Sequence, residues 1–151
     1  MDTKDIAVYA AIVSTYGAIL ATVIAWRQWK RRIKVTVVTA IMGTSAEPTS
    51  AFIVTAANPG PRPISIHGAA LQLANGKQLV MPEALYAIPL PHHLDEGQNC
   101  SFYFPLTFVS ESLIKEGFSG KVTLHAVIRD AFGKTYKSKR FTGTVEDWAQ
   151  G

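Results

Sequence analysis

Four histidines and one cysteine are the residues of this chain best suited to metal binding or covalent catalysis: His67, His92, His93, His125 and Cys100. A zinc site needs three or four converging ligands, but the chain has no Cys-x-x-Cys and no His-x-x-x-His spacing. The adjacent His92 and His93 point to opposite sides of an extended segment. Cys100 lies in a predicted strand, away from a helix N-terminus that would stabilise its thiolate. We therefore expect surface histidines, a packed thiol, no metal and no other cofactor.

Motifs for the common enzyme classes do not occur either. The chain lacks the Gly-x-Ser-x-Gly string of hydrolases, the Gly-x-x-x-x-Gly-Lys-Ser/Thr phosphate loop and the dinucleotide-binding fingerprint. The string Asp130-Ala131-Phe132-Gly133 has turn residues at both ends and no accompanying kinase motif, so it predicts a hairpin turn. The sequence therefore predicts a protein that is not an enzyme and has no evident small-molecule substrate.

The positive charge of the chain is concentrated in one short segment. The 151 residues carry a formal net charge of +4, but residues 27–34 alone carry +5, residues 1–26 carry −1, and the nine basic and nine acidic side chains of residues 35–151 cancel. A nucleic-acid-binding domain needs a basic face of its own. The distribution therefore argues against nucleic acid as a partner.

Residues 6–26 predict a membrane-spanning helix. They are 21 residues without a charge, and at 1.5 Å per residue they reach about 31 Å, the thickness of a hydrocarbon core. A cleaved signal peptide would need a basic N-terminal region, whereas residues 1–5 form a short tail that is not basic. The basic segment follows the span, so the positive-inside rule places residues 27 onward in the cytoplasm and the N-terminus outside the inner membrane.

Two sets of residues are assigned to the membrane. Aromatic and basic side chains at the end of the span are predicted to anchor the chain at the bilayer surface: Trp26, Arg27, Trp29, Lys30, Arg31, Arg32 and Lys34. Small residues spaced alternately four and three apart form one stripe along the span: Ala7, Ala11, Ser14, Ala18, Ala21 and Ala25. Because small residues let helices approach closely in lipid, this stripe predicts packing against a partner span or a second copy of the chain.

The remaining residues, 35–151, predict one β-domain that begins directly after the basic juxtamembrane segment 27–34. Alternating and β-branched runs bounded by turn residues predict seven strands, at 34–41, 51–57, 64–73, 77–81, 99–104, 121–129 and 134–141, the last running on toward residue 145. One short helix is expected over 107–116. Strands of this number and spacing predict an immunoglobulin-like β-sandwich, and a small β-barrel is the alternative.

A second basic stretch lies on the last predicted hairpin and comprises Lys134, Lys137, Lys139 and Arg140. Lysines on an edge strand discourage the sheets of different molecules from pairing. The alternative is contact with lipid headgroups beside residues 27–34. Because residues 35–151 carry no net charge, we favour the first interpretation.

Three strings carry a resemblance: NPGPRPISIHGAALQLANGKQL, LDEGQNCSFYFPL and LIKEGFSGKVTLHAVIRDAFGKTYKSKRF. The chain resembles, over most of residues 6–142, a group of uncharacterised bacterial membrane proteins. In that group a single N-terminal span is followed by a basic patch and a small cytoplasmic immunoglobulin-like domain. The resemblance implies the same architecture here and supplies no catalytic residues.

These features together predict a membrane-anchored, non-enzymatic interaction module that presents its β-domain to a protein partner at the cytoplasmic face. The rigid, proline-rich loops 58–63 and 86–96 are the expected contact surfaces, with Asn58, Arg62, His92 and His93 as candidate contact residues. The alternative is a small subunit of a larger membrane complex, such as a secretion, envelope or phage-defence assembly. Such a subunit would assemble through its transmembrane helix.

Overall fold

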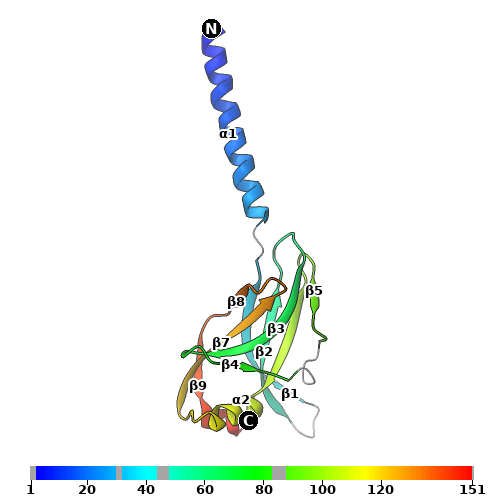
Figure 1. Ribbon diagram of the computed structural model, residues 1–151, viewed down its shortest axis with the longest axis vertical. Helices are drawn as coiled ribbons and strands as arrows, with labels where there is room; N and C mark the ends of the chain where they lie inside the picture. Colours follow the sequence, from blue (N-terminus) through cyan, green and yellow to red (C-terminus); the bar gives the residue numbers. More distant parts are fainter. Residues whose placement is uncertain (1–2, 30–31, 44–47, 83–87, 151) are drawn as a thin grey trace.

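The computed structural model describes residues 3–29, 32–43, 48–82 and 88–150, and it separates a long helix from a β-domain (Figure 1). Helix α1 (Thr3–Trp29) extends the predicted span at both ends. Its stretch Ala7–Trp26 has a mean hydropathy of 1.9, and none of that stretch is buried against the domain. The hydroxyl groups of Ser14, Thr15 and Thr22 donate to carbonyl oxygens one turn back, at 2.7–3.0 Å. Helix α1 is therefore long and apolar enough to span a membrane, with these polar groups satisfied internally.

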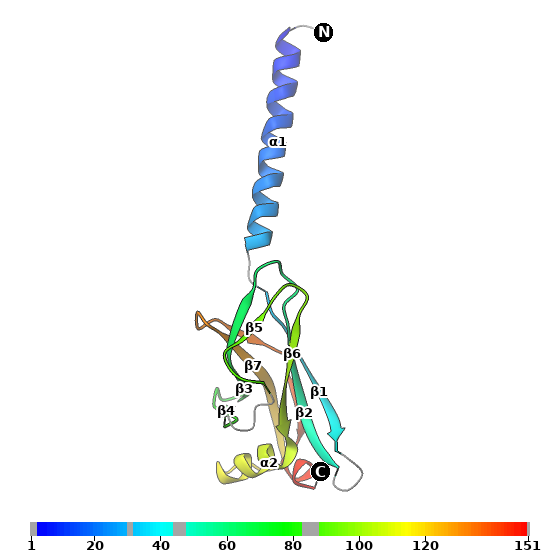
Figure 2. The same cartoon turned by 90° about the vertical axis from the view of Figure 1, so that its right-hand side faces the viewer.

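The domain is built from two antiparallel sheets (Figures 1 and 2). The smaller sheet has the order β1 (Lys34–Met42), β2 (Thr49–Ala57) and β6 (Asn99–Pro105). The larger sheet has the order β4 (Gln78–Val80), β3 (Ile64–Leu73), β7 (Lys121–Asp130) and β8 (Thr135–Lys137). Two further short strands join its ends: β5 (His92–Leu94) pairs with β3, and β9 (Phe141–Thr144) pairs with β7.

The hydrophobic core lies between the two sheets. Alternate residues of β2 and β6, including Val54, Phe102 and Phe104, are fully buried on one side. Residues of β3 and β7, including Leu71 and Ile128, belong to the same core cluster from the other sheet. This alternation is the period-two pattern from which the strands were predicted.

Two short helices close the end of the domain opposite to α1 (Figure 2). Helix α2 (Leu106–Lys115) buries Val109 and Leu113, and helix α3 (Val145–Ala149) buries Trp148. The Trp148 ring stands edge-on to Phe52, with ring centres 5.3 Å apart. Gly143 passes directly beneath this ring, where a Cβ atom would lie 2.7 Å from Cε2 of Trp148.

The sequence predictions of the fold need four corrections. The last strand is not continuous over 134–141, because residues 138–140 separate β8 from β9. Strand β5 and helix α3 were missed. With β5 and the division of the last strand, the described residues contain nine strands rather than seven, and with α3 they contain two short helices rather than one. The small β-barrel alternative is wrong, since no strand pairing joins the two sheets in the described part of the chain.

Candidate functional site

The end of the β-domain that receives α1, which we call the helix-proximal end, gathers most of the predicted site residues. Lys34, the first residue of β1, pairs with Ala57, and Ala57 pairs with Asn99 on its other side. The β2–β3 loop 58–63 and the β5–β6 turn 95–98 therefore lie at this end, as Figure 2 shows. The predicted contact loops are thus neighbours of the helix rather than parts of the opposite surface.

Asn58 joins these two loops from the inside. It is 1% exposed, and its side-chain Nδ2 donates to the carbonyl oxygens of Arg62 at 2.7 Å and Leu94 at 3.0 Å. Its Oδ1 accepts from the backbone N–H of Gly60 at 3.1 Å. The Asn58 side chain is thus hydrogen-bonded within the domain, and it fixes the shape of the loops.

The other three candidate contact residues lie nearer the surface. Arg62 and His92 are half-buried, and His93 is exposed. His92 and His93 belong to β5, where they pair with Ile66 and Ser65 of β3. The part of the predicted loop at residues 86–87 lies outside the described residues.

A basic groove runs between the start of β1 and the β8–β9 segment. Its volume is about 840 Å³, and its walls include Pro59, Tyr136 and Phe141. Six cationic side chains line it: Arg32, Lys34, Lys134, Lys137, Lys139 and Arg140. None of the described residues that line it is acidic. The fold therefore brings together the two basic stretches that lie about a hundred positions apart in the sequence.

A buried carboxylate shapes one wall of this groove. Asp130 is 2% exposed, and its Oδ1 accepts from the backbone N–H groups of Phe132 and Lys134, both at 2.9 Å. The Tyr136 hydroxyl donates to Oδ2 at 3.2 Å. The Lys134 Nζ lies 4.9 Å from the centre of the Tyr136 ring, a cation–π arrangement. Asp130 thus holds the turn, and the turn places Lys134 on the groove.

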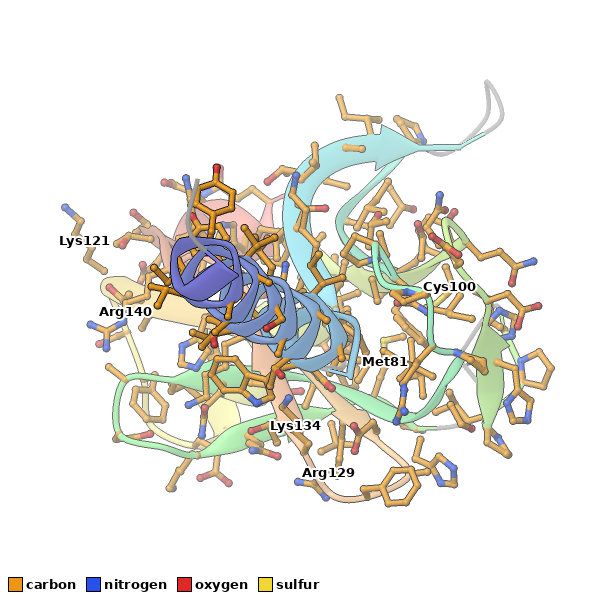
Figure 3. The ribbon with its side chains drawn as sticks, turned by 90° about the horizontal axis from the view of Figure 1, so that it is seen from above. Met81, Cys100, Lys121, Arg129, Lys134 and Arg140 are labelled. Carbon is orange, nitrogen blue, oxygen red and sulfur yellow. The ribbon has the colours of Figure 1, made fainter. Side chains whose placement is uncertain are left out.

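Ser138 shapes the same wall farther along the chain, by interrupting the strand between β8 and β9. Its backbone N–H donates to Ala126 O at 2.9 Å, while its Oγ accepts from Ala126 N–H at 2.9 Å and donates to Lys139 O at 2.7 Å. The side chain thus takes the place of a ladder partner between β8 and β9. Lys139 and Arg140 follow this break and are exposed, as Figure 3 shows for Arg140 in a view from the α1 end.

The pKa of His125 is affected by the positive charges of this region. Contrary to the expected surface position, it is 9% exposed, and its Nε2 lies 2.9 Å from Gln72 Oε1. Burial lowers the pKa of His125, and the positive charges of Lys137 and Arg140 lower it further. Two of the cations that line the groove therefore contribute to lowering the pKa of His125.

Cys100 has the surroundings of a packed residue. It is 4% exposed in β6, and burial raises the pKa of its thiol to about 11. The thiol is therefore protonated at neutral pH, whereas a nucleophile must be a thiolate. Among the described residues, no three His, Cys, Asp or Glu side chains are grouped as metal ligands would be.

The residues assigned to the membrane lie on or just after α1. All six residues of the small-residue stripe are exposed, as is Trp26. Arg32 and Lys34 are exposed and line the groove. The side chains of Arg27 and Trp29 lie outside the described part of the structure, as do residues Lys30 and Arg31.

Strand β1 forms an open edge of the smaller sheet, a surface that the sequence did not single out. In the described part of the chain it pairs only with β2. Val38 is 60% exposed and Ile41 is 76% exposed, on opposite faces of the strand. After Lys34 the strand contains no charge and no proline, the devices that normally protect such an edge.

Comparisons with known proteins give little further information. No protein-family model matches the chain, and no curated protein matches it. Among solved structures, it is similar to the X-ray structure of Northeast Structural Genomics Consortium target SoR45, with 10% sequence identity and a TM-score of 0.36. That similarity covers 76% of this chain and 86% of the other.

Proposed function

We propose that the protein is a single-pass membrane anchor whose β-domain, on the cytoplasmic side of the inner membrane, binds a protein partner without catalysing a reaction. The observation that carries this proposal is the bare helix α1, which exposes 20 consecutive apolar or weakly polar residues to its surroundings. Burying this surface in lipid removes it from water. The basic residues that follow the helix favour the cytoplasmic orientation.

The strand order supports an immunoglobulin-like sandwich as the presented domain. The smaller sheet joins the first, second and sixth strands, and the larger one joins the third and seventh strands with the last hairpin. These pairings match the A-B-E and C-F-G groupings of immunoglobulin-like domains. The sandwich architecture commonly serves as a rigid support for binding surfaces.

The open edge of β1 is the surface we assign to the partner. Extended peptides bind such an edge by adding a strand, and alternate side chains then supply specificity. Val38 and Ile41 offer apolar contacts on the two faces of this edge. The loop residues Arg62, His92 and His93 lie at the helix-proximal end, where the bilayer would restrict access.

Site-specific photocrosslinking in cells tests this assignment. A photoreactive amino acid at position 38 should give a discrete adduct that disappears when Ile41→Lys is added. The matched control is the same probe at Ile114, which is 54% exposed on helix α2. Equal adducts from positions 38 and 114, or an adduct insensitive to Ile41→Lys, would refute the assignment to β1.

Membrane attachment and orientation need a separate test. The protein should remain in the membrane fraction after alkaline carbonate extraction. Because Cys100 is buried, we suggest a Lys121→Cys variant, in which an impermeant maleimide should label the domain only after the cells are opened. Labelling of intact cells would contradict the cytoplasmic orientation.

A second candidate function, a subunit assembled through α1 into a larger membrane complex, is favoured by the small-residue stripe. The hydroxyl of Ser14 is satisfied by Ala11 within the helix, so the stripe offers close van der Waals packing rather than a polar link. Crosslinking in detergent micelles should show a defined oligomer that Ala18→Leu disrupts. The control is Ile19→Leu on another face of the helix, and an unchanged oligomer in Ala18→Leu would exclude the stripe.

A further inference from the structure

We propose that the basic groove binds the phosphate of an anionic lipid headgroup at the surface of the bilayer that holds α1. This inference rests on the proposed membrane anchoring, but it assigns a specific site to a different part of the chain. The shared chemistry is a phosphate group held by ammonium and guanidinium side chains, and the source we assign is lipid.

The groove lies next to the end of the proposed span. Arg32, one of its lining residues, follows the last helical residue, Trp29, by three positions. Three residues of extended chain reach at most about 11 Å. The end of the groove that Arg32 lines therefore lies within about 11 Å of the end of helix α1, close to the bilayer surface of the proposed anchored state.

The charge of the groove is separated from the rest of the domain. Among the residues that the structure describes, six cations line it and no acidic side chain does. Four of these cations belong to residues 35–151, where the five basic side chains outside the groove are outnumbered by nine acidic ones. A domain with zero net charge thus carries a strongly positive patch, which concentrates anions locally.

The groove has the size and the groups that a headgroup needs. A volume of about 840 Å³ lies within the range of small-molecule sites. The guanidinium groups of Arg32 and Arg140 can bind phosphate oxygens in a bidentate manner, and the lysines add point charges. Phe141 and Val37 supply apolar walls for the glycerol and the first carbons of an acyl chain.

The groove is also held open by dedicated contacts. Asp130 fixes the turn that carries Lys134, and Ser138 breaks the strand just before Lys139 and Arg140. A row of lysines that only prevents edge pairing would need neither the break nor the facing cations of Arg32 and Lys34. The arrangement is better explained by a ligand that requires cations on two opposite walls.

The test is native mass spectrometry of the full-length protein released from nonionic detergent micelles. We would titrate phosphatidylglycerol, phosphatidylcholine and glycerophosphoglycerol, which is the phosphatidylglycerol headgroup without acyl chains. Wild type should bind phosphatidylglycerol in preference to the other two. Equal binding of phosphatidylcholine would overturn the proposal, and equal binding of glycerophosphoglycerol would overturn the assignment of the phosphate to lipid.

Two variants with the same loss of charge localise the binding. The groove variant is Lys137→Gln/Lys139→Gln/Arg140→Gln, and the control is Lys115→Gln/Lys121→Gln/Arg129→Gln, whose residues do not line the groove. Each basic residue near an anionic surface changes affinity about fivefold, so the groove variant should bind phosphatidylglycerol about 100-fold more weakly. Equal affinities in the two variants would overturn the proposal.

Failure of this proposal can be told apart from failure of the proposed function. Both variants keep α1, so both should remain in the membrane fraction of cells if the anchor assignment is right. Loss of wild type from that fraction would refute the anchor, whereas a membrane-bound groove variant with unchanged lipid binding would refute only the groove. Thermal unfolding of both variants at the wild-type midpoint would show that they fold.

A second measurement detects lipid binding through the pKa of His125 rather than through the mass of the complex. Because Lys137 and Arg140 lower the pKa of His125, an anion held between them should raise it. In full-length protein in phosphatidylcholine bicelles, addition of phosphatidylglycerol should raise the pKa of His125, observed by NMR. An unchanged pKa in the presence of saturating phosphatidylglycerol would place the lipid elsewhere.

Discussion

Replacement of Asn58 by alanine should destabilise the β-domain strongly, although the sequence suggested a contact residue for a partner. The side chain makes three hydrogen bonds, to the carbonyl oxygens of Arg62 and Leu94 and to the N–H of Gly60. These bonds hold the 58–63 loop to the end of β5. Alanine removes all three and leaves the polar groups of both segments to find other partners.

The size of the effect follows from this count. A hydrogen bond contributes about 1 kcal/mol of net stability, so three bonds correspond to about 3 kcal/mol. Leu94 is fully buried, so water reaches its carbonyl group poorly. Losing the hydrogen bond to this carbonyl should therefore cost more stability than losing an average hydrogen bond. Native domains are stable by about 5–15 kcal/mol, so the variant should still fold but unfold at clearly lower urea concentration.

The assay is urea unfolding of the full-length protein in nonionic micelles, followed by near-ultraviolet circular dichroism of the packed aromatic residues. Asn75→Ala is the matched control, because Asn75 is exposed and its side chain accepts one hydrogen bond from Lys77 N–H. We expect the control to lose less than about 1 kcal/mol. Asn58→Asp keeps the acceptor for Gly60 but loses both donors, so it should be at least as unstable as Asn58→Ala.

One result would refute this reasoning. If Asn58→Ala and Asn75→Ala had the same free energy of unfolding, the loops would be held by their prolines and backbone bonds alone. Asn58 would then be available for another role, and its assignment to a partner would regain support.

Three further predictions concern single residues. Gly143→Ala should lower the free energy of unfolding in urea by about 1–3 kcal/mol, because its Cβ would lie 2.7 Å from Cε2 of Trp148. A variant as stable as wild type would show that the ring moves freely. Since the pKa of His125 is lowered in the folded domain, the unfolded chain binds a proton more readily. The contribution of His125 to stability should therefore be complete above pH 6.5 and be lost as the pH falls below it. His125→Gln should reduce the slope of the free energy of unfolding against pH, and an identical slope would contradict this prediction. Cys100 should react with a thiol reagent only upon unfolding, because it is buried with a pKa of about 11; fast labelling of native protein would disprove this.

Much of the fold could be predicted from the sequence because local patterns determine its longer strands. Strand β3 has the predicted bounds, 64–73, since a proline run precedes it and an Asn-Gly turn follows it. Strand β5 and helix α3 were missed because three and five residues are too short for a periodic pattern to be recognised. The break at Ser138 was also missed, because there a side-chain oxygen, rather than a backbone carbonyl, accepts the hydrogen bond from Ala126 N–H of β7.

The candidate site was less predictable, and the net charge explains why. The basic stretch at residues 134–140 was interpreted as edge protection because residues 35–151 sum to zero. A net charge does not show where the charges lie, whereas the groove forms between strands of two different sheets that lie far apart in the sequence. The buried position of Asn58 was not predicted for a similar reason, because its partner Leu94 lies 36 positions away and no local pattern reveals that contact.

Strand β1 connects the two surfaces that we propose. Its first residues, from Lys34 to Val37, line the basic groove, and its second half carries the exposed Val38 and Ile41. At about 3.3 Å per residue, Val38 and Ile41 lie about 13 and 23 Å along the strand from Lys34, farther from helix α1.

A headgroup in the groove would fix the rotation of the domain about α1 and leave the open half of β1 free for a partner. Loss of the groove charges should therefore weaken adducts from a probe at position 38 without abolishing them, because the edge itself is intact. Complete loss of these adducts in the groove variant would mean that the two surfaces form a single site.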